Sequence, residues 1–132
     1  MKAYTNLEQS KKLAEILPIK SADHHYVRKV TDFMGNPVDG EWSHPKYGNP
    51  NSKHANYMVQ NFTSYEKLPC WSLSALLDII SNRAHSIDED AIIELSSYKT
   101  VEWDLSISNL GLEVVTGSDP IDACYKMIFR LH

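Results

Sequence analysis

The sequence predicts an α+β fold, in which three helices pack on one face of a small antiparallel sheet. Three patterns support this class: a capped apolar stripe at the start of the chain, a strictly alternating segment after residue 100, and a proline-led amphipathic segment at the end. Of the 132 residues, 42% are hydrophobic and 23% are charged. Such a chain can bury a sizeable core without disulfide or metal staples, so we expect residues 1–132 to form a single domain.

The first helix is expected over residues 6–17. Thr5 and Glu8 have the spacing of a capping box, in which each side chain accepts a hydrogen bond from the backbone amide of the other residue. Leu13 and Leu17 belong to an apolar stripe at helical spacing. Pro18 ends the helix, because the residue before a proline is driven out of the α region.

A strand is expected from His24 to Met34, although its alternation of apolar and polar residues is imperfect. The segment that follows, at about 35–56, is rich in proline, glycine and asparagine and is predicted to be a long irregular loop. A loop of this length in so small a domain is either mobile or a binding element. A short strand at 57–59 is expected to close the loop.

The second helix is predicted to begin after Ser72, a favourable N-cap, and to end near residue 82. The segment that follows it is ambiguous. Residues 86–89 have the pattern of a capping box for another helix, yet the apolar residues from Ile92 to Leu95 also suit a strand. We favour a strand near 91–98.

The clearest strand covers residues 100–108, where apolar and polar side chains alternate without error. Such a strand presents one face to the core and the other to water. Trp103 belongs to the apolar set, so we expect its ring in the core. A turn at Ser108 and Asn109 should lead to a partner strand around Leu112 and Val114.

The closing helix has the most complete set of signals. Asp119 is a candidate N-cap, Pro120 suits the first helical position, and Asp122 favours the positive end of the helix dipole. The side chains expected to face the core share helical spacing, and they are Ile121, Cys124, Ile128 and Leu131, with Met127 beside them.

The formal net charge of −4 is distributed unevenly along the chain. Residues 86–122 hold one basic residue against nine acidic ones, three of which, Asp88, Glu89 and Asp90, are consecutive. Because acidic side chains repel phosphate, we do not expect nucleic acid as a partner. The segment is either a solvated face or a docking surface for a basic protein, with these three acids as candidate contacts.

Cys70 is the candidate for covalent chemistry. It lies just before the second predicted helix, where a helix dipole lowers the pKa of a thiol and favours the nucleophilic thiolate. The alternative is that Cys70 packs as part of an apolar lead-in to that helix. A disulfide with Cys124 would require the fold to bring the two thiols together, which the sequence does not decide.

We expect no metal ion and no cofactor. His24 and His25 are adjacent, so on a strand they would point to opposite faces, and the five glycines form no phosphate-binding motif. Three aromatic side chains, Trp42, Tyr47 and Tyr57, lie in or beside the long loop. They either stack on a base or sugar or hold the loop against the rest of the protein.

Three segments of the chain are similar to one group of proteins. They are LEQSKKLAEILP at 7–18, PCWSLSALLD at 69–78 and DPIDACYKMI at 119–128. Together they resemble small uncharacterised proteins of gut-bacterial prophages and other mobile elements. Members of that group usually carry Asn-Pro where Asp119 and Pro120 stand here, which keeps a capping residue before the proline. The resemblance implies a cytoplasmic accessory protein of a mobile element and transfers no activity or site residue.

Three hypotheses about function follow from these patterns. The first is a small non-enzymatic module that binds another protein, which the long loop and the acidic segment favour. The second is a thiol-dependent enzyme that uses Cys70 with a histidine, and the third is a weak nucleic-acid binder. Because no apolar run approaches the roughly 20 residues of a membrane helix, we expect no membrane span and a cytoplasmic location. The sequence leaves the oligomeric state open.

Overall fold

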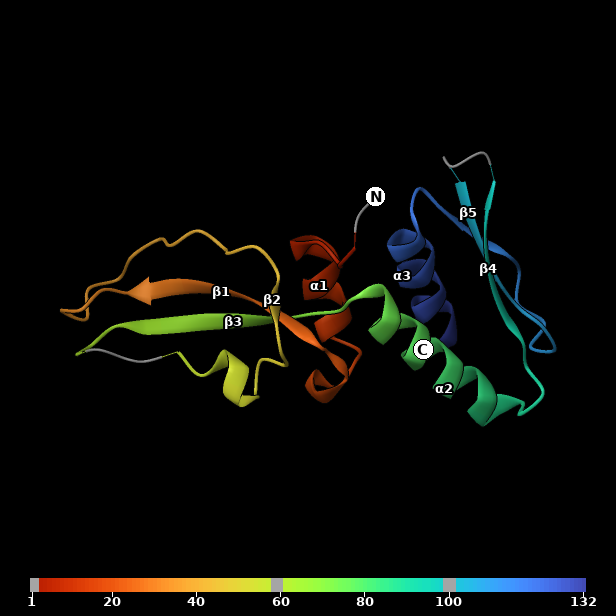
Figure 1. The fold of residues 1–132 in the computed structure, drawn as a ribbon, viewed down its shortest axis with the longest axis horizontal. Helices are drawn as coiled ribbons and strands as arrows, with labels where there is room; N and C mark the ends of the chain where they lie inside the picture. The colour runs from red at the N-terminus through yellow and green to blue at the C-terminus, as the bar shows by residue number, and fades with distance from the viewer. Residues whose placement is uncertain (1–2, 58–60, 99–101) are drawn as a thin grey trace. The chain divides into compact units, whose positions relative to one another are not determined.

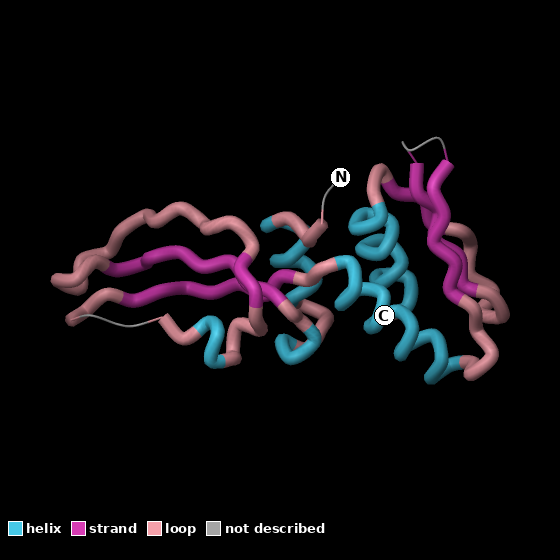
Figure 2. Tube along the Cα trace, viewed as in Figure 1, coloured by secondary structure: helices cyan, strands magenta, loops and turns pink. Residues whose placement is uncertain are grey.

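The computed structural model describes residues 3–57, 61–98 and 102–132. The described residues form two compact units: an N-terminal unit, made of those within 6–71, and a C-terminal unit, made of residues 3–5 and those within 72–132. Among the described residues, each unit has a three-stranded antiparallel sheet, with one α-helix in the first unit and two in the second (Figure 2). The α+β class is therefore confirmed, with two sheets where the sequence predicted one. That the chain folds as a single domain stays a prediction.

Helix α1 (Leu7–Ala14) opens the N-terminal unit. Its N-cap is Asn6 and not Thr5 as predicted, because Asn6 Oδ1 accepts a hydrogen bond from the Gln9 amide at 2.8 Å and Gln9 Oε1 accepts one from the Asn6 amide at 3.1 Å. The predicted capping box therefore exists, one residue farther along. The helix also ends at Ala14, before the predicted end, because the next two amides bond to carbonyls three residues back in a tighter turn.

The sheet of the N-terminal unit has the order β2–β1–β3, with β1 (His24–Thr31) in the centre (Figure 1). β1 confirms the first predicted strand but is shorter, because Asp32 starts a turn. The Asp32 carboxylate accepts hydrogen bonds from the amides of Met34 and Asn36, both at 2.9 Å. The predicted loop at about 35–56 is irregular over most of its length and contains the short strand β2 (Lys46–Tyr47).

Strand β3 (Ser64–Cys70) was not predicted from the sequence. It pairs with β1 and lies at the edge of the sheet, where Pro69, which has no amide hydrogen to donate, is tolerated. The strand predicted at 57–59 falls partly outside the described residues, and Tyr57, which is described, belongs to no strand.

Trp71, the last residue of the N-terminal unit, has a fully buried side chain. Its indole Nε1 donates a hydrogen bond to Ser21 Oγ at 3.0 Å, which satisfies the polar end of the ring. Leu13 from α1 and Tyr26 and Cys70 from the sheet are buried as well. The helix, the sheet and the segments that connect them thus all contribute buried residues to this unit.

Helix α2 (Leu73–Ile87) begins where it was predicted to begin. Ser72 is its N-cap, and the Ser72 Oγ accepts a hydrogen bond from the Ala75 amide at 3.2 Å. The helix continues past its predicted end near residue 82, and Ala84 in this added turn is fully buried. It stops at Asp88, whose backbone is extended, so residues 86–89 end this helix and cap no further one.

In the C-terminal sheet, β5 (Glu102–Ile107) lies between β4 (Ile93–Tyr98) and β6 (Val115–Gly117). β4 confirms the strand favoured at 91–98, and β5 confirms the alternating strand as far as residues 102–107, since residues 100 and 101 lie outside the described part. β6 begins after the predicted partner segment at 112–114. The intervening turn is longer than expected and contains two residues with positive φ, Asn109 (+68°) and Gly111 (+67°).

Trp103 is half-buried and does not lie in the core as predicted. Directly across from it stand Ser97 on β4 and Gly117 on β6, two positions with no large side chain to cover the ring. The later residues of the same strand face, Leu105 and Ile107, supply the core instead, with exposed fractions of 0% and 5%.

Helix α3 (Pro120–Leu131) confirms the predicted closing helix. Asp119 is its N-cap, and Asp119 Oδ1 accepts a hydrogen bond from the Asp122 amide at 2.8 Å. α3 approaches β6 so closely that a Cβ atom at Gly117 would lie 2.4 Å from the backbone nitrogen of Ala123, so only glycine fits there. The whole predicted stripe is buried, namely Ile121, Cys124, Met127, Ile128 and Leu131.

The buried thiol of Cys124 makes stability depend on alkaline pH. Burial, assisted by the nearby Asp119 carboxylate, raises the pKa of Cys124 to about 12. An exposed thiol ionises near pH 9, so the stabilisation from keeping this thiol neutral is complete below pH 9 and is lost as the pH rises towards 12. The free energy of unfolding should therefore fall by up to about 1.4 kcal/mol per pH unit in this window.

The variant Cys124→Ala isolates this contribution. We expect it to be less stable than the unchanged protein at pH 8, because it leaves a cavity, and to approach the unchanged protein between pH 9.5 and pH 11, because it has no thiol to ionise. Urea unfolding at each pH measures the difference. A difference that stays constant with pH would contradict the prediction.

Candidate functional site

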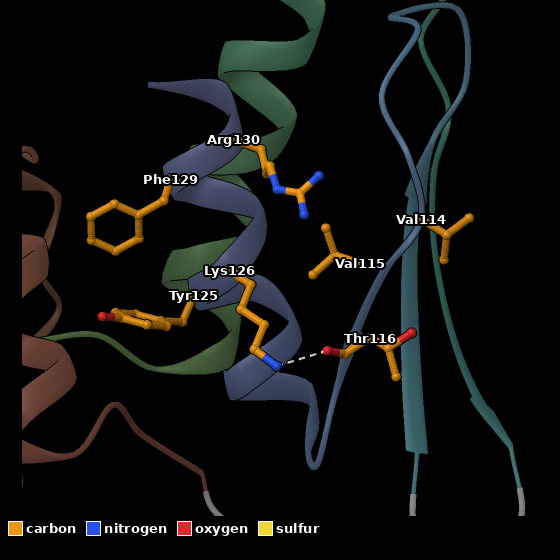
Figure 3. Close-up of a pocket in the computed structure, with 7 residues that line it drawn as sticks. All are labelled: Val114, Val115, Thr116, Tyr125, Lys126, Phe129 and Arg130. Carbon is orange, nitrogen blue, oxygen red and sulfur yellow. Dashed lines mark hydrogen bonds between the residues drawn. The ribbon is translucent and has the colours of Figure 1, made fainter.

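A cleft of about 620 Å³ lies in the C-terminal unit between α3 and β6, and we call it the α3–β6 cleft (Figure 3). Strand β6 and the residue before it supply one wall, and the exposed side of α3 supplies the other. The lining residues are Val114, Val115, Thr116, Tyr125, Lys126, Phe129 and Arg130. A volume of this size is typical of sites that bind a ligand or a few side chains.

The helical periodicity of α3 places four of these residues together. Residues three and four apart lie on one side of a helix, so burial of the Ile121 and Cys124 side turns positions 125, 126, 129 and 130 away from the core. The helix thereby extends Lys126 and Arg130 towards β6, while the rings of Tyr125 and Phe129 project from the side of α3 away from the sheet (Figure 3). The arrangement follows from core packing alone.

The charged groups of the cleft are two cations, Lys126 and Arg130. Lys126 Nζ donates a hydrogen bond to the Thr116 carbonyl at 3.0 Å and lies 3.3 Å from Asp122 Oδ2 (Figure 3). Arg130 is exposed and makes no hydrogen bond or ion pair with any residue that the structure describes. Its guanidinium, whose planar donors match a carboxylate, remains available for an acidic group.

The apolar part of the cleft is unusually open to solvent. Val114 is 56% exposed and Phe129 is 42% exposed. Phe129 packs edge-on against Tyr125 one turn earlier, with ring centroids 5.0 Å apart (Figure 3). Tyr125 and Phe129 thus form an exposed aromatic pair on α3, and Val114 is exposed on the strand side of the cleft.

The loop aromatics predicted as a binding surface serve partly as anchors. Trp42 is half-buried, and the Arg28 guanidinium carbon lies 4.9 Å above the centre of its ring. Tyr47 is 70% exposed but makes edge contacts with the rings of His24 and His54, at 5.7 and 5.2 Å between centroids. Both side chains thus connect the loop to its surroundings.

Tyr57 takes part in a buried network that the sequence analysis missed. His25 is fully buried, and its Nδ1 lies 2.8 Å from the Gly48 carbonyl, so Nδ1 must carry the proton and donate. Nε2 is then an acceptor for the Tyr57 hydroxyl at 2.5 Å. Burial raises the pKa of the Tyr57 hydroxyl, which keeps it protonated for this role. Because two adjacent histidines on a strand point to opposite faces, the sequence indicated that one of them would be buried, but it did not indicate its hydrogen-bond partners.

The consecutive acids form a turn rather than a part of the cleft. The Asp88 carboxylate accepts a hydrogen bond from the Asp90 amide at 2.9 Å, and Glu89 is exposed between them. None of the three lines the α3–β6 cleft. Other acids of the predicted acidic segment, Glu94 and Asp104, alternate with the core residues of their strands and so lie on the opposite sheet face.

Cys70 is fully buried at the end of β3 and is a free cysteine, as is Cys124. The Cys70 thiol is hydrogen-bonded with the Tyr26 hydroxyl. Burial raises the pKa of the Tyr26 hydroxyl, and Cys70 adds to this effect. The helix dipole suggested an activated thiolate, but the structure places this thiol in the interior, beside the Tyr26 hydroxyl. The position matches the packing alternative for Cys70 that the sequence left open.

Comparison with models of protein families, with curated proteins and with solved structures found no match for the chain. Within residues 3–57, 61–98 and 102–132, no three His, Cys, Asp or Glu side chains are placed to hold a metal ion together. No helix in the same described ranges has the length and apolar character to cross a membrane.

The hydrogen bond between His25 and Tyr57 predicts how removal of the Tyr57 hydroxyl changes the stability of the protein. Tyr57→Phe removes the donor to His25 Nε2 and leaves a buried acceptor unsatisfied, so we expect the free energy of unfolding to fall by about 1–3 kcal/mol. Tyr47→Phe, which removes a hydroxyl from an exposed ring, is the matched control and should change it by less than about 0.5 kcal/mol. Urea unfolding measures both, and equal effects of the two substitutions would contradict the assignment.

Proposed function

We propose that this protein is a small non-enzymatic interaction module that binds a segment of a protein partner in the α3–β6 cleft. The observation that carries the proposal is the combination, in one cleft, of exposed apolar side chains with a cation that has no partner among the described residues. Apolar contact supplies the driving force for association, and the cation selects the charge of what is bound. The apolar and cationic side chains of the cleft are therefore suited to binding a segment of another protein.

The chemistry of the cleft specifies the kind of segment. Val114 and Phe129 favour aliphatic or aromatic side chains, and Arg130 favours a carboxylate beside them. Lys126 is already held by Asp122 and by the Thr116 carbonyl, so it reinforces the positive potential more than it offers a free donor. The preferred partner segment is therefore apolar and acidic.

We further propose a cytoplasmic setting, in which the protein acts as an accessory protein of a mobile element. This part of the proposal is supported by the similarity of the three sequence segments at 7–18, 69–78 and 119–128 to proteins of such elements. The absence of an apolar run of membrane length in the sequence agrees with it.

Photo-crosslinking in cells tests whether the cleft binds protein. A photoreactive phenylalanine analogue is placed at Phe129, inside the cleft, or at Ile87, an apolar side chain of the same unit that is 56% exposed at the end of α2 and does not line the cleft. We expect a discrete cross-linked protein from position 129 and none from position 87. Adding Arg130→Glu should reduce the yield several-fold. Equal cross-linking from both positions, or none from 129, would overturn the proposal.

A further inference from the structure

Four exposed apolar side chains gather at one end of the N-terminal sheet, and we call this group the hairpin tip. It lies where β1 ends and β3 begins, away from β2 (Figure 1). The members and their exposed fractions are Phe33 (62%), Met34 (66%), Val38 (36%) and Phe62 (71%). The Phe62 amide donates a hydrogen bond to the Phe33 carbonyl at 3.2 Å, so the two rings project from neighbouring points of the backbone.

The hairpin tip is held in a defined conformation. Asp32 binds the amides of Met34 and Asn36, and Thr31 Oγ1 donates a hydrogen bond to the Phe62 carbonyl at 2.7 Å. Gly35 adopts φ +82°, in the left-handed region that a turn of this kind needs. An apolar surface that is ordered before binding loses little conformational entropy when it docks, which favours association.

The charges of the hairpin tip and of the α3–β6 cleft are opposite. Residues 31–39 contain two acids, Asp32 and Asp39, and no base. Asp39 lies 4.0 Å from the Arg28 guanidinium on β1, so Asp32 is the acid of the tip that has no ion pair among the described residues. The cleft lining contains two bases, Lys126 and Arg130, and no acid. Each surface also exposes large apolar side chains, so the tip has the two properties that the cleft selects.

We propose that the hairpin tip of one molecule occupies the α3–β6 cleft of a second copy of this chain. This inference rests on the proposed function, because it names the partner of the same cleft. The two surfaces differ, so the contact is heterologous and joins different faces of the two copies. It is also small, so we expect a weak association with a dissociation constant on the order of 0.1 mM.

Complementation between two defective variants tests the inference. The tip variant carries Phe33→Ser and Phe62→Ser, and the cleft variant carries Val114→Asp and Arg130→Glu; all four side chains are exposed. Sedimentation velocity from about 10 μM to about 1 mM spans the expected range of association. The unchanged chain should exceed its monomer mass of 15.0 kDa as concentration rises, and each variant alone should stay monomeric. An equimolar mixture should form a 1:1 pair, because it retains one intact tip and one intact cleft.

The control variant is Ile92→Ser, which removes an apolar side chain that is 60% exposed elsewhere in the C-terminal unit and should associate like the unchanged chain. Circular dichroism establishes that each variant is folded, and Phe62→Ser and Arg130→Glu alone replace any double variant that is not. A monomeric unchanged chain at every concentration, or a mixture that fails to pair, overturns the inference. A cross-link from position 129 to a different protein would then still support the proposed function, so the two failures are distinguishable.

Discussion

The packing of α3 against the C-terminal sheet determines where the cleft lies and what lines it. Seven buried residues fix the rotation of the helix, and the close approach at Gly117 fixes its distance from β6. Once these are set, Lys126 and Arg130 extend towards β6, and Tyr125 and Phe129 line the cleft from the other side of the helix (Figure 3). A rotation by one residue would drive a cation into the core, at a cost of several kcal/mol. The same interaction therefore stabilises the unit and positions its binding groups.

In the C-terminal unit the central interaction is the apolar packing of α3. In the N-terminal unit it is the hydrogen-bond network of the buried His25. His25 ties β1 to two distant points of the chain, the Gly48 carbonyl and the Tyr57 hydroxyl. Both lie on the segment that leaves β1 and returns to β3, so this long connection is held against the sheet instead of moving freely. Because the connection is anchored, the apolar end of β1 and β3 is presented on paired strands and a hydrogen-bonded turn.

Local signals predicted the elements that depend on neighbouring residues. Ser72 and Asp119 cap their helices as expected, and the alternation around Leu105 identified β5. β3 could not be found in this way, because its charged residues and Pro69 obscure any alternation and its stability comes from pairing with β1. The cleft could not be predicted because it depends on where β6 begins. After a longer turn, β6 begins later in the sequence than the predicted partner segment at 112–114. The burial of His25 depends on partners 23 and 32 residues away, a separation that no local pattern records.

The hydrogen bond from Lys126 to the Thr116 carbonyl has a consequence for how the sheet meets other polypeptides. Thr116 is on an edge strand, and a backbone carbonyl on such a strand is the kind of acceptor that an incoming strand would need. The Lys126 ammonium already donates to that carbonyl and places a hydrated charge where the backbone of an incoming strand would lie. Whatever enters beside β6 must therefore be recognised through its side chains and not by extension of the ladder, which also protects this margin of the protein from fibril-like stacking.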